Sequence, residues 1–406
     1  MFGLTTKIVI TQVSTEQYPG RTKVFTFNFS ADESSSSTWA HLTDTFKITL
    51  PRAVYFKNED GSITTWDKTP IYGNPEKQPL ILRGDKISVT HGYSYYKPTG
   101  STFDRKTIVT KEYERFSGYI TKIKNQTPIQ LECEDNMYAC KQTFVEDGVW
   151  NIDGSPLTLE KLLLQFLKAS TFSDAKNFTV VTDNYEHKIQ KFFTKHYTLA
   201  MVLNDLRKNY HFESFFRGNV LHCGIIRYYP EERTTHQFEF QNNIISNNLD
   251  YQRADDVRIG IIAKSIVKFE LTSLNSSGKK RTQHKQLEVR VGDMDGEVRT
   301  LFFWGVTSEA ELKKQALAKM PFIKYEGFRG SFTTFGLPFV KHGDLVQLVN
   351  NKLPEMNGTY LVKEVQTECG SSKGLRQTIF LDIRVDGILK DRGGAKVLDE
   401  LQKTGL

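Results

Sequence analysis

Short segments in which hydrophobic and polar positions alternate make up most of the chain, and this period of two is typical of strands with one buried face. β-Branched and aromatic residues carry the pattern, while Gly, Pro, Asn and Asp separate the segments. In the first part of the chain the segments are KVFTFNF (23–29), DTFKITL (44–50), DKISVTHGY (85–93), FSGYITKIK (116–124) and PIQLECED (128–135). We therefore predict a first β-domain over residues 1–145.

Three polar stretches interrupt this first block. They are DESSSS (32–37), the segment at 57–79 and YKPTGSTFDRK (96–106). A composition rich in Ser, Gly, Pro, Asn and Asp is typical of turns at the protein surface. We predict that all three are exposed loops or insertions.

The spacing of hydrophobic residues becomes helical after about residue 146. In SPLTLEKLLLQFLKAS (155–170) the positions on one stripe, following Thr158 as a predicted N-cap, are Leu159, Leu162, Leu163, Phe166 and Leu167. A second stripe follows in YTLAMVLNDLRKNYHF (197–212), and ESFFRGNVLHCG (213–224) has the pattern of a hairpin that turns at Arg217-Gly218-Asn219. These features predict a small α/β helix-hairpin unit over residues 146–245.

Strand patterns return from residue 246, and they predict a second β-domain over 246–385, followed by a C-terminal tail at 386–406. KQLEVRVGDMDGEVRTLFF (285–303) has the pattern of a hairpin that turns at Asp295-Gly296. A single helix interrupts this block, with Leu312, Ala316 and Met320 on its apolar face. We predict that this helix ends before Pro321.

The segment FRGSFTTFGLPFVKHGDLVQL (328–348) combines glycines and aromatics around a Gly-Asp turn, which either an active-site loop or a structural corner would explain. We favour the corner. The glycines would supply turn conformations or close backbone packing, the phenylalanines would fill a barrel core or a subunit seam, and the aspartate would stabilise the turn. The candidate structural or assembly residues are Gly330, Phe332, Phe335, Gly336, Phe339, Gly343 and Asp344.

Length, charge and cysteine content narrow the class of protein. A chain of 406 residues is expected to form two or three domains. Lys plus Arg exceeds Asp plus Glu by 54 − 47, or +7, but the charges are scattered. This excess, with 28 Phe and 17 Tyr, leaves a nucleic-acid binding module as a weak alternative. We predict that the N-terminus forms the first strand. No apolar stretch is long enough to span a membrane. The four cysteines are predicted to be free thiols.

A search for catalytic chemistry finds no complete set of residues. Cys133 and Cys140 are too far apart, and His222 and Cys223 too close, for the paired ligands of a zinc site. No nucleophile elbow, phosphate loop or metalloprotease helix is present. The acidic segments ECED, ADD and DMDGE leave a peptidoglycan hydrolase as an alternative, because one sequence does not show where two carboxylates lie. We predict no catalytic residue, no cofactor and no metal site, and hence no enzyme.

The order of the segments adds a resemblance to a family. The segments that carry it are FSGYITKIKNQTPIQLECEDNMYACKQ, TLAMVLNDLRKNYHFESFFRGNVLHCG, FEFQNNIISNNLDYQRADDVRIGIIAKS and YEGFRGSFTTFGLPFVKHGDLVQL. This succession, over roughly residues 110–385, resembles the bacteriophage tail baseplate hub family, also called late-control D. The family is related to the hub part of type VI secretion spikes and contractile injection systems.

The resemblance implies an α+β fold, mainly β, in which two tube-type antiparallel β-barrel domains flank a small α/β unit. It also implies a homotrimer that caps the tail tube and links it to spike and baseplate proteins. The expected partners are a hexameric tail tube protein, the spike or tip, other baseplate proteins and the tape measure protein, with DNA only passing through the lumen. Such a protein would be assembled in the host cytoplasm and located in the virion tail or baseplate.

Overall fold

The computed structural model describes residues 2–50, 55–57, 63–65, 79–96, 107–109, 111–124, 128–150, 157–183, 192–210, 212–225, 233–253, 258–274, 280–303, 306, 308–323 and 326–385. Strands predominate in this part of the chain, and most of their pairings are antiparallel. The α+β, mainly β, class is therefore confirmed. No membrane-spanning helix was found in the described part of the chain.

The chain divides into two compact units. Unit 1 comprises 1–234, 332–344 and 362–380, and unit 2 comprises 235–331, 345–361 and 381–406. The two units therefore alternate along the sequence, and the predicted limits of the domains stay a prediction. Among the described strands no closed barrel is formed, so the two tube-type barrels are not confirmed.

Unit 1 contains a run of neighbouring antiparallel strands in the order β23-β3-β4-β10-β9-β7-β1-β2. The strands are β1 (Phe2–Thr11), β2 (Val24–Phe27), β3 (Asp32–Thr38), β4 (Thr45–Thr49), β7 (Lys86–Tyr96), β9 (Tyr113–Lys124), β10 (Gln130–Glu134) and β23 (Gly358–Gly370). Alternate positions of these strands form the core, including Ile8, Ile10, Ile48, Ile87 and Leu131. The period of two in the sequence thus marks the buried face, as predicted. Short pieces at the margins are β5 (Tyr55–Lys57), β6 (Ile63–Thr65) and β8 (Thr107–Val109).

The serine-rich stretch DESSSS is not a loop, which corrects the prediction. It forms β3, which pairs with β4 on one side and with β23 on the other. Side chains outside the strand satisfy two of its hydroxyl groups, since Ser36 Oγ donates to Glu364 and Ser37 Oγ donates to Asp44. Strand preference depends on such surroundings, so a polar segment can lie inside a sheet. The other two predicted loops, 57–79 and 96–106, fall mostly outside the described residues.

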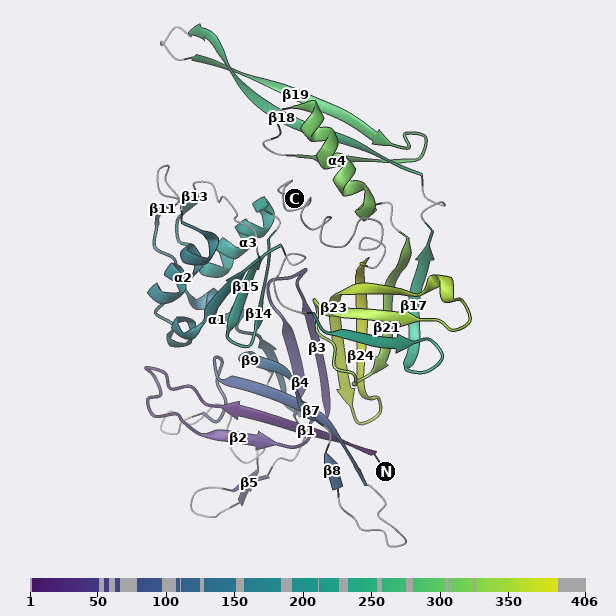
Figure 1. Cartoon of the computed structure of the whole chain (residues 1–406). Coiled ribbons are helices and arrows are strands. Elements are labelled where there is room, and N and C mark those ends of the chain that lie inside the picture. Colours follow the sequence, from purple (N-terminus) through teal and green to yellow (C-terminus); the bar gives the residue numbers. More distant parts are fainter. Residues whose placement is uncertain are drawn as a thin grey trace. The chain divides into compact units, whose positions relative to one another are not determined.

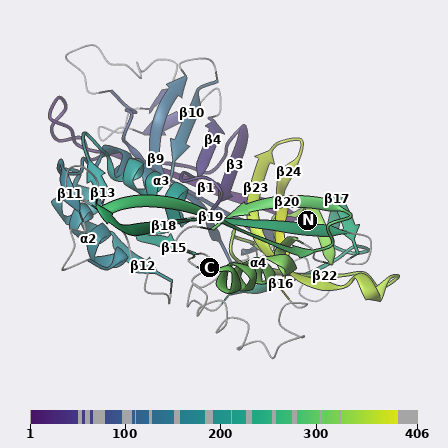
Figure 2. The ribbon, with the colours of Figure 1, turned by 90° about the horizontal axis from the view of Figure 1, so that it is seen from above.

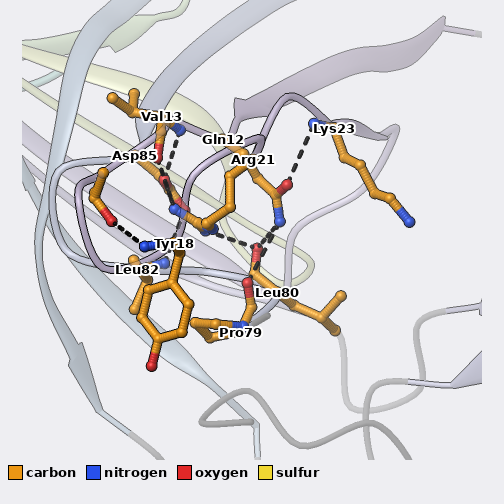
Figure 3. Close-up of polar contacts among 10 residues, drawn as sticks. Gln12, Val13, Tyr18, Arg21, Lys23, Pro79, Leu80, Leu82 and Asp85 are labelled. Carbon is orange, nitrogen blue, oxygen red and sulfur yellow. Dashed lines mark hydrogen bonds and ion pairs between the residues drawn. The ribbon is translucent and has the colours of Figure 1, made fainter. Parts of the chain in front are cut away.

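A buried ion pair joins the β1–β2 connection to the start of β7 in unit 1 (Figure 3). The two terminal nitrogens of Arg21 each donate to a different carboxylate oxygen of Asp85 at 2.7 Å. The carboxylate also accepts from the backbone N–H groups of Val13 and Leu82 at 2.9 and 2.7 Å. A bidentate arginine–carboxylate contact fixes the relative orientation of the two side chains as well as their distance, so the β1–β2 connection is held in one conformation.

The two predicted helices and the predicted hairpin are present in unit 1, and the limits of the α/β unit stay a prediction (Figure 1). The elements from residue 137 to residue 224 are α1 (Met137–Gln142), β11 (Gly148–Trp150), α2 (Leu159–Ala169), η2 (Ser173–Asn177), β12 (Thr179–Thr182), β13 (Phe192–Thr194), α3 (Leu199–Tyr210), β14 (Glu213–Arg217) and β15 (Val220–Gly224). Of these, α1 lies before residue 146, where the predicted unit begins. The predicted stripe of α2 is buried, and Thr158 caps the helix by accepting from the Lys161 N–H at 3.4 Å. Gly218, at φ 57°, lies in the turn of the predicted β14–β15 hairpin.

Unit 2 contains a long hairpin with a helix packed on it, as Figure 1 and Figure 2 show. The hairpin is β18 (Ile259–Leu274) and β19 (Lys280–Gly292), and the helix is α4 (Glu309–Ile323). Leu312 and Ala316 of the predicted stripe are buried, and Met320 packs against the same cluster. The remaining strands with residues in this unit are β16 (Thr235–Glu239), β17 (Ile244–Gln252), β20 (Glu297–Phe302), β21 (Gly327–Phe335), β22 (Leu345–Val349) and β24 (Gly374–Arg384), and η5 (Pro354–Met356) lies between β22 and β23.

Two predictions for this unit were wrong. β20 does not form a hairpin with β19 but pairs in parallel with β18, on the other edge of that strand. The connection crosses the start of β18, where the Asp293 N–H donates to the Ile259 carbonyl at 3.0 Å. The helix α4 also continues past Pro321 to Ile323. Proline removes one backbone donor and disfavours continuation of a helix, and α4 ends two residues beyond it, at Ile323.

Candidate functional site

The predicted corner lies between β21 and β22, and its residues 332–344 belong to unit 1. Gly343, at φ 86°, donates its N–H to the Val362 carbonyl at 2.8 Å. The Asp344 carboxylate accepts a hydrogen bond from the Lys341 N–H at 2.8 Å. The backbone carbonyl of Asp344 accepts one from the Val362 N–H at 2.9 Å. The Gly-Asp turn is therefore a structural turn attached to β23.

The three phenylalanines of the corner lie in different surroundings. Phe332 is buried, at 1% exposed, whereas Phe335 is 46% exposed and lies beneath the Arg376 guanidinium at 4.9 Å. Phe339 is half-buried, with the Arg115 guanidinium 4.0 Å from its ring centroid and the Tyr113 ring centroid at 5.4 Å. Of these three phenylalanines, Phe332 alone is part of the core of a single chain. The subunit seam therefore remains the proposal for Phe335.

Two glycines of the predicted set lie where a side chain would collide. A Cβ at Gly336 would overlap the Leu375 side chain within unit 1. Gly330 belongs to unit 2, where its φ is 112° and a Cβ would overlap the backbone carbonyl of Asn248. Both positions thus need the close approach that only glycine allows. The seven predicted residues do not form one cluster.

A cavity of about 120 Å³ lies beside the corner in unit 1. Aromatic and charged side chains line this cavity, which we call the corner cavity. The lining residues include Asp44, Arg115, Asp135, Arg217, Phe339 and His342. Arg115 donates to the Gly336 carbonyl and Arg217 to the His342 carbonyl, so both arginines are attached to the corner. Sequence spacing gave no signal for this group, because its members come from separate strands and loops.

The two carboxyl groups of the corner cavity are perturbed by burial. Desolvation raises the pKa of Asp44 to about 6, although hydrogen bonds from Ser37 and the Thr38 N–H oppose it. Desolvation and the neighbouring Asp44 also raise the pKa of Asp135, which accepts from the Met137 N–H at 3.2 Å. These hydrogen bonds fix the end of β3 and the start of α1. Each carboxyl therefore has a structural role.

His342 is the buried imidazole of the corner. Its Nδ1 lies 2.8 Å from Ser37 Oγ, and its ring meets those of Phe215 and Trp39 edge to face at 4.8 and 6.0 Å. Desolvation and the nearby Arg217 hold the pKa of His342 well below its usual range. The ring is therefore neutral at physiological pH and acts as part of the packing.

The Asp44 carboxyl should make the stability of the chain depend on pH. Its pKa is raised from 3.8 to about 6 in the folded chain, so the folded state holds this proton more tightly than the unfolded state. Its contribution is fully present below pH 3.8 and is lost as the pH rises through about 6. We expect Asp44→Asn to reduce this loss, measured as urea midpoints across the interval. The exposed Asp295→Asn is the control, and an unchanged profile in Asp44→Asn would contradict the assignment.

Comparisons with known proteins give matches at the level of structure. No protein-family model and no curated protein matches the sequence. A tail protein from Neisseria meningitidis MC58 matches with a TM-score of 0.55 and 12% identity, over 95% of this chain and 98% of that one. The 43 kDa tail protein of prophage MuSo2 from Shewanella oneidensis matches with a TM-score of 0.53 and 12% identity, over 94% and 98%. The predicted resemblance is thereby confirmed as one of fold: the chain shares the fold of these tail proteins.

Proposed function

We propose that this chain is a structural protein of a phage tail, a trimeric hub that caps the tail tube and links it to the spike and baseplate proteins. The observation that carries the proposal is the likeness to two tail proteins along nearly the full length of both chains. A match of that extent concerns the whole arrangement of elements and not one common motif. The hub is not an enzyme in this proposal, and its place is the virion tail or baseplate after assembly in the host cytoplasm.

Symmetry gives the reason for a trimer. A three-fold ring meets a six-fold tube when each chain offers two similar modules, and the chain has two compact units, each containing antiparallel strand pairs. In the proposal each unit supplies one tube-type barrel face. The partners are the hexameric tube protein, the spike or tip, other baseplate proteins and the tape measure protein, and DNA passes only through the lumen.

Mass measurement and imaging test the proposal. We expect light scattering after size exclusion to give three chains per particle, either for the chain alone or after mixing with the tail tube protein of the same phage. Negative-stain images should then show rings. A monomer under all of these conditions, with no ring in the presence of tube protein, would contradict the hub.

Gly343→Val should lower both the thermal midpoint and the yield of trimer. Valine at φ 86° is strained by its branched Cβ, and Gly343 is also attached to β23 through Val362. The matched control is Gly148→Val, where φ is not positive and no atom lies within 4 Å of the added Cβ. Normal trimer yield and an unchanged thermal midpoint in Gly343→Val would show that trimer assembly does not depend on the conformation of this turn.

The peptidoglycan hydrolase has one observation in its favour, the pair of carboxyl groups with raised pKa in the corner cavity. Both carboxyl groups are occupied by hydrogen bonds that hold local structure, which favours the hub. An assay for cell-wall clearing separates the two functions. Clearing by the purified chain that is lost in Asp44→Asn would support the hydrolase over the hub.

A further inference from the structure

Three strands of unit 1 bring together a carboxylate, an imidazole and a thiol. Glu33 lies on β3, His91 on β7 and Cys369 on β23. Glu33 and Cys369 are direct partners in the antiparallel pairing of β3 with β23, so their side chains leave the same face of the sheet. The three side chains are buried, at 3%, 1% and 5% exposed. Sequence spacing could not show this group, because its members are far apart along the chain.

The potential ligand atoms of the three residues converge. One carboxylate oxygen, one ring nitrogen and the sulfur all lie within 4.8 Å of one another. Glu33 Oε2 and His91 Nε2 are 3.0 Å apart. Within the described part of the chain, however, neither carboxylate oxygen and neither ring nitrogen makes a hydrogen bond. Buried polar atoms without partners cost free energy, so this group needs an explanation.

A simple ion pair between Glu33 and a protonated His91 explains the group only in part. It accounts for the 3.0 Å separation, but it leaves the second oxygen and the second ring nitrogen without partners. The contact between Glu33 Oε2 and His91 Nε2 also has the length of a hydrogen bond, but the two groups are not oriented to form one. Two ligands bound to one ion are arranged in that way, close to each other but pointing at a third atom.

We propose that Glu33, His91 and Cys369 bind a divalent transition-metal ion, for which zinc is the best fit. Carboxylate oxygen, imidazole nitrogen and thiolate sulfur are the ligand types that zinc takes in proteins. A carboxylate and a thiolate supply two negative charges, and the imidazole is neutral, so the ligands cancel the charge of the ion inside the protein. Three protein ligands leave the fourth tetrahedral position to water.

Binding requires the thiol to lose its proton. Burial, with Glu33 and Asp32 nearby, raises the pKa of Cys369 to about 12, while Arg115 acts in the opposite direction. On binding, the sulfur–hydrogen bond is replaced by a sulfur–zinc bond and the proton passes to solvent, without any change of oxidation state. The ion would join β7 to the paired strands β3 and β23.

Metal analysis of the purified full chain gives the first test. We expect about one zinc per chain after incubation with zinc and removal of excess metal. Cys369→Ser and His91→Gln should each lower the affinity for zinc by at least about tenfold and so reduce that content, because even residues that only support metal ligands contribute about 10–100-fold. Cys140→Ser is the matched control, because Cys140 is equally buried but lies outside the group.

Cobalt substitution gives a test that needs no folded variant. The wild-type chain loaded with cobalt should show a thiolate-to-cobalt charge-transfer band and the intense visible bands of tetrahedral cobalt. The thermal midpoint of wild type should also be higher with zinc than with a chelator. A wild-type chain that retains no zinc and shows no thiolate-to-cobalt band would overturn the proposal. Full metal content in Cys369→Ser and His91→Gln would overturn it too.

Discussion

Arg21→Met should lower the free energy of unfolding by about 3–5 kcal/mol, the usual cost of removing one partner from a buried ion pair. The side chains of Arg21 and Asp85 are 0% and 1% exposed, so the remaining carboxylate would have neither its cation nor water. The change also removes the arginine hydrogen bonds to the carbonyl groups of Val13 and Leu80. Urea denaturation followed by tryptophan fluorescence measures the loss.

A second variant separates the charge from the packing. Arg21→Met combined with Asp85→Asn should lose less than Arg21→Met alone, because no uncompensated charge stays buried. Lys373→Met is the surface control: its ion pair with Glu368 is largely exposed, and we expect little or no change there. A loss for Arg21→Met as small as that of the control would show that the pair does not hold the β1–β2 connection.

Gly330→Val should destabilise the chain by about 3–5 kcal/mol, since it combines backbone strain with overpacking. The φ of Gly330 is 112°, and an added Cβ would overlap the Asn248 carbonyl of β17, the neighbour of β21 in the sheet. The strands would have to separate to make room. Thermal and urea unfolding both report the change.

Gly20→Val isolates the contribution of the backbone conformation. Gly20 has a φ of 83°, but no atom lies within 4 Å of a Cβ added there. We expect a loss of about 1–2 kcal/mol, the cost of a left-handed conformation alone. Equal losses in Gly20→Val and Gly330→Val would mean that β21 and β17 do not approach as closely as described.

Local patterns predicted the elements whose cause is local. The stripe of α2 and the turn at Gly218 depend on neighbours within a few residues, and both were confirmed. The serine strand β3 was missed because its hydroxyl groups bond to Asp44 and to Glu364 on β23. The parallel pairing of β20 was missed for a related reason, since a Gly-containing turn does not specify which edge the next strand joins.

In the candidate site too, features set by neighbouring residues could be predicted and features set by distant residues could not. The Gly343-Asp344 turn could be predicted, because its hydrogen bond from Lys341 to Asp344 spans three residues. The corner cavity could not, since Arg115 and Arg217 reach it from separate strands. Likewise, nothing in the spacing of residues 33, 91 and 369 connects them, and only the pairing of β3 with β23 brings two of them together.

The parallel pairing of β20 with β18 implies an order of folding for this sheet. β18 and β19 are joined by a short connection and can pair as a local hairpin, which requires little loss of chain entropy. Residues 293–296 then cross the start of β18, so that β20 pairs along the other edge of that strand, and α4 follows it in the chain. We therefore expect the hairpin to act as the template, with backbone amides of β19 gaining protection from solvent exchange before those of β20.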